Sequence, residues 1–201
     1  MRIALVDYGA GNLTSVRKGF AAAGADVFMP CTPDELRLAT GVVVPGVGHF
    51  AATAALDDPW RDAIHKALDR GALLFGICLG QQWLFEGSDE APDIRGLGAI
   101  PGRCRRLPPT LKVPHVGWNS LDLRRPSRLL DGIPDGTQAY FTHSYAADVT
   151  DDAVATTTHA APFASVVERG QLFGVQFHPE KSGESGVRML RNFISLCSRN
   201  D

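Results

Sequence analysis

Residues 72–86 read ALLFGICLGQQWLFE, and this stretch joins the pattern of a buried strand to that of a helix. Residues 72–75 form the short apolar run of a parallel strand, and residues 79–85 have the apolar spacing of the first turns of a helix. Between them stands Gly76-Ile77-Cys78-Leu79-Gly80, with the glycine-x-nucleophile-x-glycine spacing of a nucleophile elbow. The stretch therefore predicts a tight turn, permitted by its glycines, that pushes the side chain of Cys78 out above a sheet.

Cys78 is the candidate nucleophile of this elbow. A free thiol titrates at about pH 8.5, and the positive end of the helix that follows favours the more reactive thiolate. The backbone N–H of Leu79 would point at an oxyanion forming next to the sulfur. Cysteine is also a common small apolar filler of protein cores, so the pentapeptide alone leaves both roles open. Catalysis needs a base from elsewhere in the chain.

The first half of the chain alternates strand and helix patterns. Strands are expected at residues 3–6, 25–29 and 42–44, and helices at residues 13–23 and 60–70. The turn with Gly9 and Gly11 lacks the third glycine of a dinucleotide fingerprint, so we expect no nucleotide there. The loop PGVGHF, residues 45–50, follows a strand at the edge where open α/β sheets keep their sites, although a plain turn has the same composition.

The second half of the chain has short, closely spaced strand patterns, at residues 138–141, 153–157, 164–167 and 172–177, and an amphipathic closing helix at residues 184–196. Short strands with tight turns predict antiparallel additions to the parallel core. No repeat or linker divides the chain. We therefore predict one domain over residues 1–201, an α/β fold. It is a three-layer α/β/α sandwich with a mostly parallel central sheet and an antiparallel, strand-rich part in the second half.

The composition narrows the class of protein. The 201 residues carry a formal net charge of −2, and 44% of them are hydrophobic, which argues against binding to nucleic acid or to an anionic membrane. No apolar run reaches membrane-spanning length, and an acid at Asp7 ends the first apolar run before it could serve as a signal peptide. The four cysteines have neither metal-site spacing nor a dense disulfide pattern. We expect a cytoplasmic protein with reduced thiols and without metal or other cofactor.

His178 and Glu180 are the candidate base and its orienting acid. They lie two residues apart in GVQFHPEKS, at the end of a predicted strand, where residues i and i+2 project to the same side. A carboxylate beside an imidazole sets its tautomer, as in a catalytic triad. Taken alone, His-Pro-Glu is a weak signal that favours an exposed ion pair at the end of a strand. Together with Cys78 the pair forms a coherent set of nucleophile, base and orienting group.

The order nucleophile, histidine, acid, with the last two in one motif, resembles the class I glutamine amidotransferases. Within them the chain looks like the glutaminase subunits of imidazole glycerol phosphate synthases, enzymes of histidine biosynthesis. The segments that carry this resemblance are DYGAGNLTSV (residues 7–16), PGVGHF (45–50), GICLGQQ (76–82), KVPHVGWNSL (112–121), YFTHSY (140–145) and GVQFHPEKS (174–182). The chain departs from the family at Gln81, usually methionine, and at Trp83, usually leucine. We expect both to alter packing and to leave the triad intact.

The resemblance implies roles for further residues. The oxyanion would be held by N–H groups of Leu79 and of the Gly46-Val47 segment, and the glutamine pocket would contain Gly48, Gln82, Glu90, Ser144 and Tyr145. The implied partner is a (β/α)₈-barrel cyclase subunit in a heterodimer, docked on Asn12, Trp118, Asn119 and Lys181. For Glu90 a place in a solvated acidic run is a second interpretation, and for Trp118 a place in the core.

The chemistry implied is hydrolysis of glutamine to glutamate and ammonia, with the ammonia passed to the cyclase. There it would serve to form imidazole glycerol phosphate and an aminoimidazole carboxamide ribonucleotide. The two-glycine loop at residues 45–48 would hold its N–H groups turned away until the partner binds. Three alternatives stay open at this point. They are an amidotransferase subunit of another pathway, a cysteine hydrolase acting on esters or other amides, and a non-enzymatic subunit.

Overall fold

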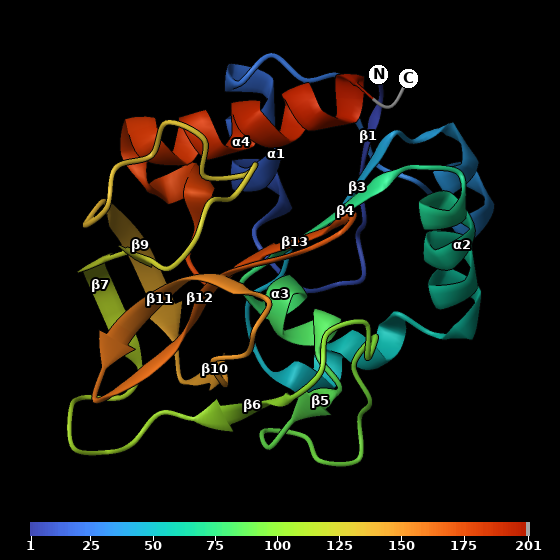
Figure 1. Ribbon diagram of the computed structural model, residues 1–201. Coiled ribbons are helices and arrows are strands. Elements are labelled where there is room, and N and C mark those ends of the chain that lie inside the picture. Colours follow the sequence, from blue (N-terminus) through green and yellow to red (C-terminus); the bar gives the residue numbers. More distant parts are fainter. Residues whose placement is uncertain (200–201) are drawn as a thin grey trace.

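An eight-stranded sheet runs through the centre of the computed structural model, which describes residues 1–199 (Figure 1). Its order is β2 (Val27–Phe28), β1 (Ile3–Leu5), β3 (Gly41–Val44), β4 (Leu73–Ile77), β13 (Leu172–Val175), β12 (Ala161–Arg169), β11 (Ala153–His159) and β8 (Asp122–Leu123). The first five strands are parallel, and the rest are added antiparallel. The predicted α/β fold with a parallel core and an antiparallel second half is therefore confirmed.

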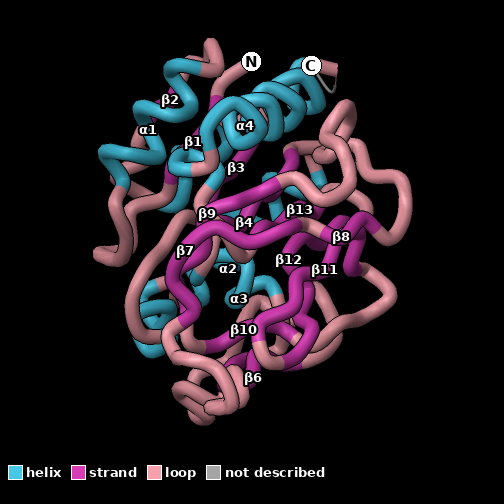
Figure 2. The backbone as a smooth tube through the Cα atoms, turned by 90° about the vertical axis from the view of Figure 1, so that its left-hand side faces the viewer, coloured by secondary structure: helices cyan, strands magenta, loops and turns pink. Residues whose placement is uncertain are grey.

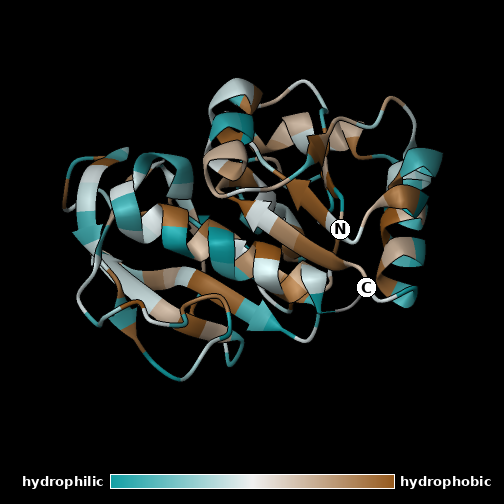
Figure 3. Ribbon diagram, turned by 90° about the horizontal axis from the view of Figure 1, so that it is seen from above, coloured by the Kyte–Doolittle hydropathy of each residue, from teal (hydrophilic) through white to brown (hydrophobic). Residues whose placement is uncertain are grey.

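Helices cover both faces of this sheet. One face carries α1 (Leu13–Ala22) and α4 (Gly183–Ser198), and the other carries α2 (Asp58–Asp69) and α3 (Leu79–Leu84) (Figure 1). Side chains alternate along a strand, so Ile3 packs into the same core as Phe193 of α4, whereas Ala4 packs into the core on the other face, with Ile64 of α2. Figure 3 shows largely hydrophobic strands at the centre, and helices in which hydrophobic and hydrophilic residues alternate.

The sequence located most of these elements to within a few residues. The helix α1 begins at Leu13, where the side chain of Asn12 accepts a hydrogen bond from the Ser15 N–H, and α2 is capped in the same way by Asp57. Three short 3₁₀ helices follow no strong pattern in the sequence: η1 (Pro33–Leu38), η2 (Phe50–Ala55) and η3 (Pro179–Lys181). Within residues 1–199, none of the helices has the length and apolar character needed to cross a membrane.

Two small sheets complete the fold. One contains β10 (Tyr145–Ala147), β6 (Arg103–Arg106) and β5 (Gly87–Ser88); the other pairs β7 (His115–Ser120) with β9 (Gln138–His143), antiparallel (Figure 2). The sequence did not predict β7. Its apolar side chains, Val116 and Trp118, point to solvent while His115 is buried, so its pattern is the reverse of an ordinary half-buried strand.

The glycines of the elbow have a different role from the one expected. The left-handed backbone belongs to Cys78 itself, with φ 55° and ψ −106°, whereas Gly76 and Gly80 are not in that region. A side chain at Gly80 would collide with the Val44 carbonyl, and one at Gly76 would collide with the backbone of Gly80. These glycines therefore allow α3 to pack directly on β3 and β4, and the sharp turn is made by Cys78.

Substitution of Gly80 by alanine tests this packing. The new methyl group would meet backbone rather than a movable side chain, so we expect Gly80→Ala to lower the free energy of unfolding by about 3 kcal/mol. Gly87→Ala is the control, because its methyl group would lie 3.0 Å from the end of the flexible Arg103 side chain and 3.3 Å from the nearest backbone atom, the Ile94 carbonyl oxygen, whereas at Gly80 the methyl group would overlap the Val44 carbonyl oxygen. Urea unfolding of both variants measures the difference, and equal stabilities would contradict the packing argument.

Candidate active site

Cys78 lies at the point where β4 ends and α3 begins. Its N–H donates to the Val175 carbonyl at 2.7 Å, which ties the turn to the neighbouring strand β13. A non-glycine residue in the left-handed region stores strain of about 1–3 kcal/mol, which is retained only where the surrounding structure enforces it. Here the turn holds the sulfur above the carboxyl ends of the central parallel strands, the edge at which open α/β sheets bind ligands.

His178 and Glu180 meet as predicted, but through a different local structure. The chain after β13 forms the 3₁₀ turn η3, not an extended segment, and this turn brings Nδ1 of His178 to 2.9 Å from Oε1 of Glu180. The side chains are only 3% and 2% exposed, so the alternative of a surface ion pair is wrong. Because β13 is the parallel neighbour of β4, Cys78 and His178 extend from the ends of adjacent strands.

The environment favours the protonated imidazole of His178. Burial lowers its pKa, but hydrogen bonding to Cys78 and Glu180 and the charges of both groups outweigh burial and raise the pKa to about 9. Its Nδ1 is committed to Glu180, and its Nε2 has no well-aligned hydrogen bond among the described residues. An imidazolium next to a thiol stabilises the thiolate, so the pair is suited to nucleophilic catalysis.

A cavity of about 290 Å³, called the nucleophile cavity below, opens directly onto the candidate nucleophile Cys78. All five residues predicted for the glutamine pocket line it: Gly48, Gln82, Glu90, Ser144 and Tyr145. The Glu90 carboxylate accepts the Phe50 N–H at 2.8 Å, so this side chain is not part of a solvated acidic run. The sequence had not singled out three further lining residues, Pro114, Thr142 and His143. The volume is below that of pockets for drug-sized ligands and suits a single amino acid.

The predicted oxyanion hole is closed in this structure. The N–H of Leu79 donates to the Gly46 carbonyl at 3.3 Å and is therefore occupied. The hydroxyl of Tyr8 lies against Gly46, and a side chain at position 46 would collide with it. This hydroxyl has no hydrogen-bond partner among residues 1–199. Burial, and after it the charge of Cys78, raises the pKa of the Tyr8 hydroxyl. The sequence did not predict Tyr8 at the site.

Gln176 is a further residue near Cys78 that the sequence did not predict at the site. Its Nε2 lies 3.6 Å from the sulfur of Cys78, and its Oε1 accepts a hydrogen bond of 3.1 Å from Gln82. Gln82 also donates to the Tyr145 carbonyl at 2.8 Å. The signal available in the sequence was one amide between the apolar Val175 and Phe177; the structure places it directly after β13 and buries it fully.

The residues predicted for docking divide into two kinds. Trp118 is 56% exposed and stands edge-on to Tyr140, whose ring also lies 5.8 Å from the Lys181 ammonium, so a core position for Trp118 is wrong. Asn12 and Asn119 are instead engaged within the chain. The first caps α1, and the amide of the second donates to His115 and to the Thr158 carbonyl. Trp118, Lys181 and Asn12 are exposed, and Asn119 is half-buried.

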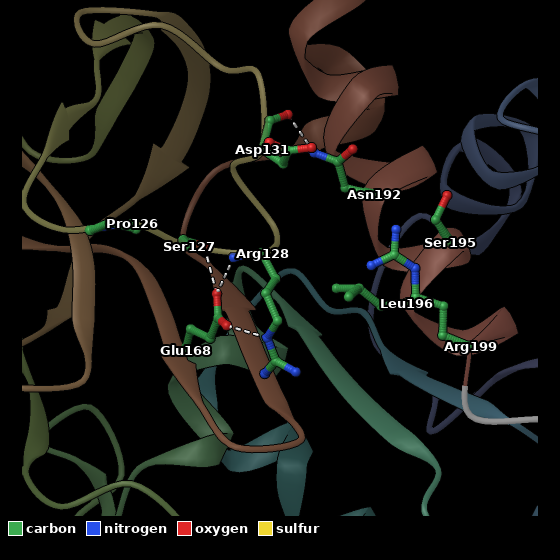
Figure 4. Close-up of a pocket in the computed structure, with 9 residues that line it drawn as sticks. All are labelled: Pro126, Ser127, Arg128, Asp131, Glu168, Asn192, Ser195, Leu196 and Arg199. Carbon is green, nitrogen blue, oxygen red and sulfur yellow. Dashed lines mark hydrogen bonds and ion pairs between the residues drawn. The ribbon is translucent and has the colours of Figure 1, made fainter.

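A second cavity, of about 460 Å³, lies between residues 126–131 and α4 (Figure 4). Several of its polar groups are paired with one another: Arg128 and Ser127 bind the Glu168 carboxylate, and Asn192 donates to the Asp131 carbonyl. In the described chain no group of three His, Cys, Asp or Glu side chains is placed to hold a metal ion. The nucleophile cavity is therefore the candidate active site.

The departures from the family pattern lie on α3, away from the cavity. Gln81 and Trp83 are both fully buried. Gln81 donates to the Ala164 carbonyl at 2.9 Å, while its Oε1 has no hydrogen-bond partner among the described residues. Neither side chain lines the nucleophile cavity, so both act on packing between the helix and the sheet.

The family model described as glutamine amidotransferase class-I matches residues 4–196. The chain belongs to this family. It is 48% identical to imidazole glycerol phosphate synthase subunit HisH of Natronomonas pharaonis, over 97% of this chain and 94% of that protein. It is also 48% identical to HisH of Halobacterium salinarum, over 98% and 94%. Identity at this level over nearly the whole length places the chain with the HisH amidotransferases, which are enzymes.

Solved structures extend the agreement on the fold. PurLQS from Thermotoga maritima superposes with a TM-score of 0.77 at 18% identity, over 96% of this chain and 97% of the other. A structure described as a glutamine amidotransferase gives a TM-score of 0.76 at 18% identity, over 97% and 98%. At such low identity these comparisons bear on the fold alone.

Removal of the thiol tests the electrostatic pairing of Cys78 with His178. In Cys78→Ala both contributions of the sulfur to the His178 pKa disappear, while burial, which lowers it, remains. We therefore expect the pKa of His178 to fall below its value of about 9 in the intact protein. An NMR titration of the imidazole C–H resonances measures the change. An unaltered titration midpoint would mean that sulfur and imidazole are not coupled.

Proposed function

We propose that this chain hydrolyses glutamine to glutamate and ammonia through a triad of Cys78, His178 and Glu180. The carrying observation is the buried His178–Glu180 pair, which extends from the strand adjacent to the elbow that presents Cys78. Membership of the class I glutamine amidotransferases supports glutamine as the substrate, and so does a cavity of amino-acid size over the sulfur.

In the first half of the reaction the Cys78 thiolate attacks the side-chain carboxamide carbon. The carbonyl π electrons move onto oxygen, and a tetrahedral oxyanion forms. His178, protonated at the outset, donates a proton to the amide nitrogen as the C–N bond breaks, so ammonia leaves and a γ-glutamyl thioester remains. Neutral His178 then takes a proton from water, whose oxygen displaces the thiolate to release glutamate. Glu180 keeps Nδ1 protonated throughout and so directs Nε2 to the reaction.

The oxyanion hole is gated in this proposal. Leu79 can stabilise an oxyanion only after its N–H is released from the Gly46 carbonyl. Rotation of the peptide between Gly46 and Val47 would remove that carbonyl and turn the Val47 N–H inward, which supplies the second donor. The closed arrangement limits hydrolysis in the absence of a partner, because it withholds donors from the transition state while leaving the triad assembled.

The pocket residues have matching roles toward glutamine. Both N–H groups of the Gln82 amide are engaged by the Tyr145 carbonyl and by Gln176, which leaves its Oε1 as an acceptor for the substrate's ammonium group. The Glu90 carboxylate lies on the same wall and would attract that ammonium as well. Ser144, Tyr145 and Gly48 lie in the rest of the lining, where they contact the substrate's α-carbon groups.

Released ammonia must reach its acceptor before water protonates it, so we infer a partner that shelters it. The relatives are named as subunits of imidazole glycerol phosphate synthase, which favours a cytoplasmic heterodimer with a (β/α)₈-barrel cyclase. The cyclase would use the ammonia to form imidazole glycerol phosphate and an aminoimidazole carboxamide ribonucleotide. The docking face in this proposal contains exposed Trp118, Lys181 and Asn12, together with half-buried Asn119.

The nucleophile is tested by Cys78→Ala, with exposed Cys31→Ala as the matched control. We expect the first variant to lose at least about a thousandfold in glutaminase activity, the order of loss on removal of a catalytic nucleophile. Glutamate release should be measured with and without the cyclase subunit and its nucleotide ligand. Activity retained in Cys78→Ala would refute the triad, whereas activity indifferent to the cyclase would assign the enzyme to another pathway.

The docking face is tested by Trp118→Ala. Truncation of an exposed aromatic anchor should weaken binding to the cyclase about thirtyfold, the effect of a hot-spot residue worth about 2 kcal/mol. Leu38→Ala is the control, since Leu38 is also an exposed apolar residue but lies on η1. Titration calorimetry compares the two. An unchanged dissociation constant for Trp118→Ala would remove this residue from the interface.

A further inference from the structure

Two buried histidines, His115 and His143, form a hydrogen-bonded pair behind the nucleophile cavity. Nδ1 of His115 lies 3.0 Å from Nε2 of His143, across the paired strands β7 and β9 (Figure 2). Nδ1 of His143 in turn lies 3.0 Å from the Tyr145 carbonyl oxygen. Neither histidine belongs to the triad, yet His143 lines the cavity.

The backbone determines the direction of each bond in this pair. A carbonyl oxygen only accepts, so His143 must carry its proton on Nδ1 and present Nε2 as an acceptor. At the other end, Asn119 is oriented by two backbone groups, since its Nδ2 donates to the Thr158 carbonyl and its Oδ1 accepts the Ser120 N–H. Its amide must therefore donate to Nε2 of His115, at 3.2 Å. Both ends require that His115 donates from Nδ1 to His143.

Both rings are neutral across the physiological range, so this arrangement persists. Burial, reinforced by the charge of His159, lowers the pKa of His115 to about 4. Burial also lowers the pKa of His143 to about 3. The hydrogen bond to the Tyr145 carbonyl raises this pKa, whereas the charges of His115, His159 and His178 lower it further. A second proton on either ring would place two donors face to face.

The Tyr145 carbonyl also accepts from Gln82, and this second bond orients the other amides. Because Gln82 donates from Nε2, Gln176 must turn its Oε1 toward Gln82 and its Nε2 toward the sulfur of Cys78. A reversed Gln176 amide would set a carbonyl oxygen against the thiolate and two donors against each other. The chain of bonds thus runs from Asn119, next to exposed Trp118, to the nucleophile.

We propose that Gln176 is a positioning residue whose N–H stabilises the Cys78 thiolate, and that His115 and His143 fix the position of the Tyr145 carbonyl on which the orientation of Gln82 and Gln176 depends. The inference rests on the proposed function of Cys78 and adds to it a group beside the sulfur and a physical connection to the surface. A partner that moves Asn119 would alter the hydrogen bonds of the nucleophile without touching it.

The first test is the alkylation of Cys78 by iodoacetamide as a function of pH, followed by mass spectrometry of the full-length chain. In Gln176→Met the donor is lost at similar side-chain volume, so the midpoint should rise and the rate at pH 7 should fall about tenfold. Gln81→Met is the matched control, with the same substitution at an equally buried site that does not contact Cys78, and should react like the parent. Gln176→Glu, which cannot donate when ionised, keeps the test valid if the methionine variant does not fold, and should shift the midpoint in the same direction.

The second test addresses the histidines. His115→Phe keeps a ring in place but removes the donor to His143, and should lower the alkylation rate at pH 7 about threefold with a raised midpoint. His159→Phe is its control, because His159 stacks on His115 at 4.2 Å without being a link in the chain. A shift in His115→Phe but not in His159→Phe supports transmission through the pair.

The outcomes separate the two levels of the proposal. A parental pH profile in both Gln176 variants would overturn the role of Gln176. A shifted profile in those variants with a parental one in His115→Phe would overturn the role of the histidines. Failure of the proposed function looks different: Cys78→Ala would retain glutamine hydrolysis, whatever the alkylation profiles.

Discussion

The left-handed backbone at Cys78 is the constraint on which the site depends. It places the sulfur above the sheet only because α3 packs directly on β3 and β4, where Gly76 and Gly80 leave no side chain between the backbones. The bond from the Cys78 N–H to the Val175 carbonyl joins the same turn to β13. The strain is therefore sustained by the buried centre of the parallel sheet.

Burial of a charge pair is the second organising feature. The backbone of His178 is held against β9, since its N–H donates to the Tyr140 carbonyl, and the Ser182 hydroxyl accepts the Tyr140 N–H while it donates to the His178 carbonyl. Withdrawal from water strengthens the attraction between carboxylate and imidazolium and keeps the pair rigid. The same β9 carries the histidine that reaches the cavity, so one strand orients both the base and the amides around the sulfur.

Local sequence patterns predicted the elements in which each face of a strand or helix lies in a single environment, either the core or the solvent. The strands β1, β3 and β4 are apolar runs buried on both faces. The helices α1 and α2 have side-chain caps, and α1, α2 and α4 all have periodic apolar residues, so the positions of these elements follow from nearest neighbours in sequence. The strand β7 escaped prediction because it exposes Val116 and Trp118. The prediction of an extended link between His178 and Glu180 was wrong because Pro179 begins a 3₁₀ turn.

The sequence by itself determined the fold class and provided the triad candidates and five of the residues that line the cavity, because short motifs record the chemistry that each position must supply. Only the tertiary structure decided that Cys78, not its glycines, makes the sharp turn. It also decided that the N–H of Leu79 donates to the Gly46 carbonyl, and that the amide nitrogen of Gln176 faces the sulfur of Cys78. These features depend on contacts between residues up to 98 positions apart. Hydrogen-bond direction in such contacts is dictated by backbone carbonyls that three-dimensional packing brings within reach.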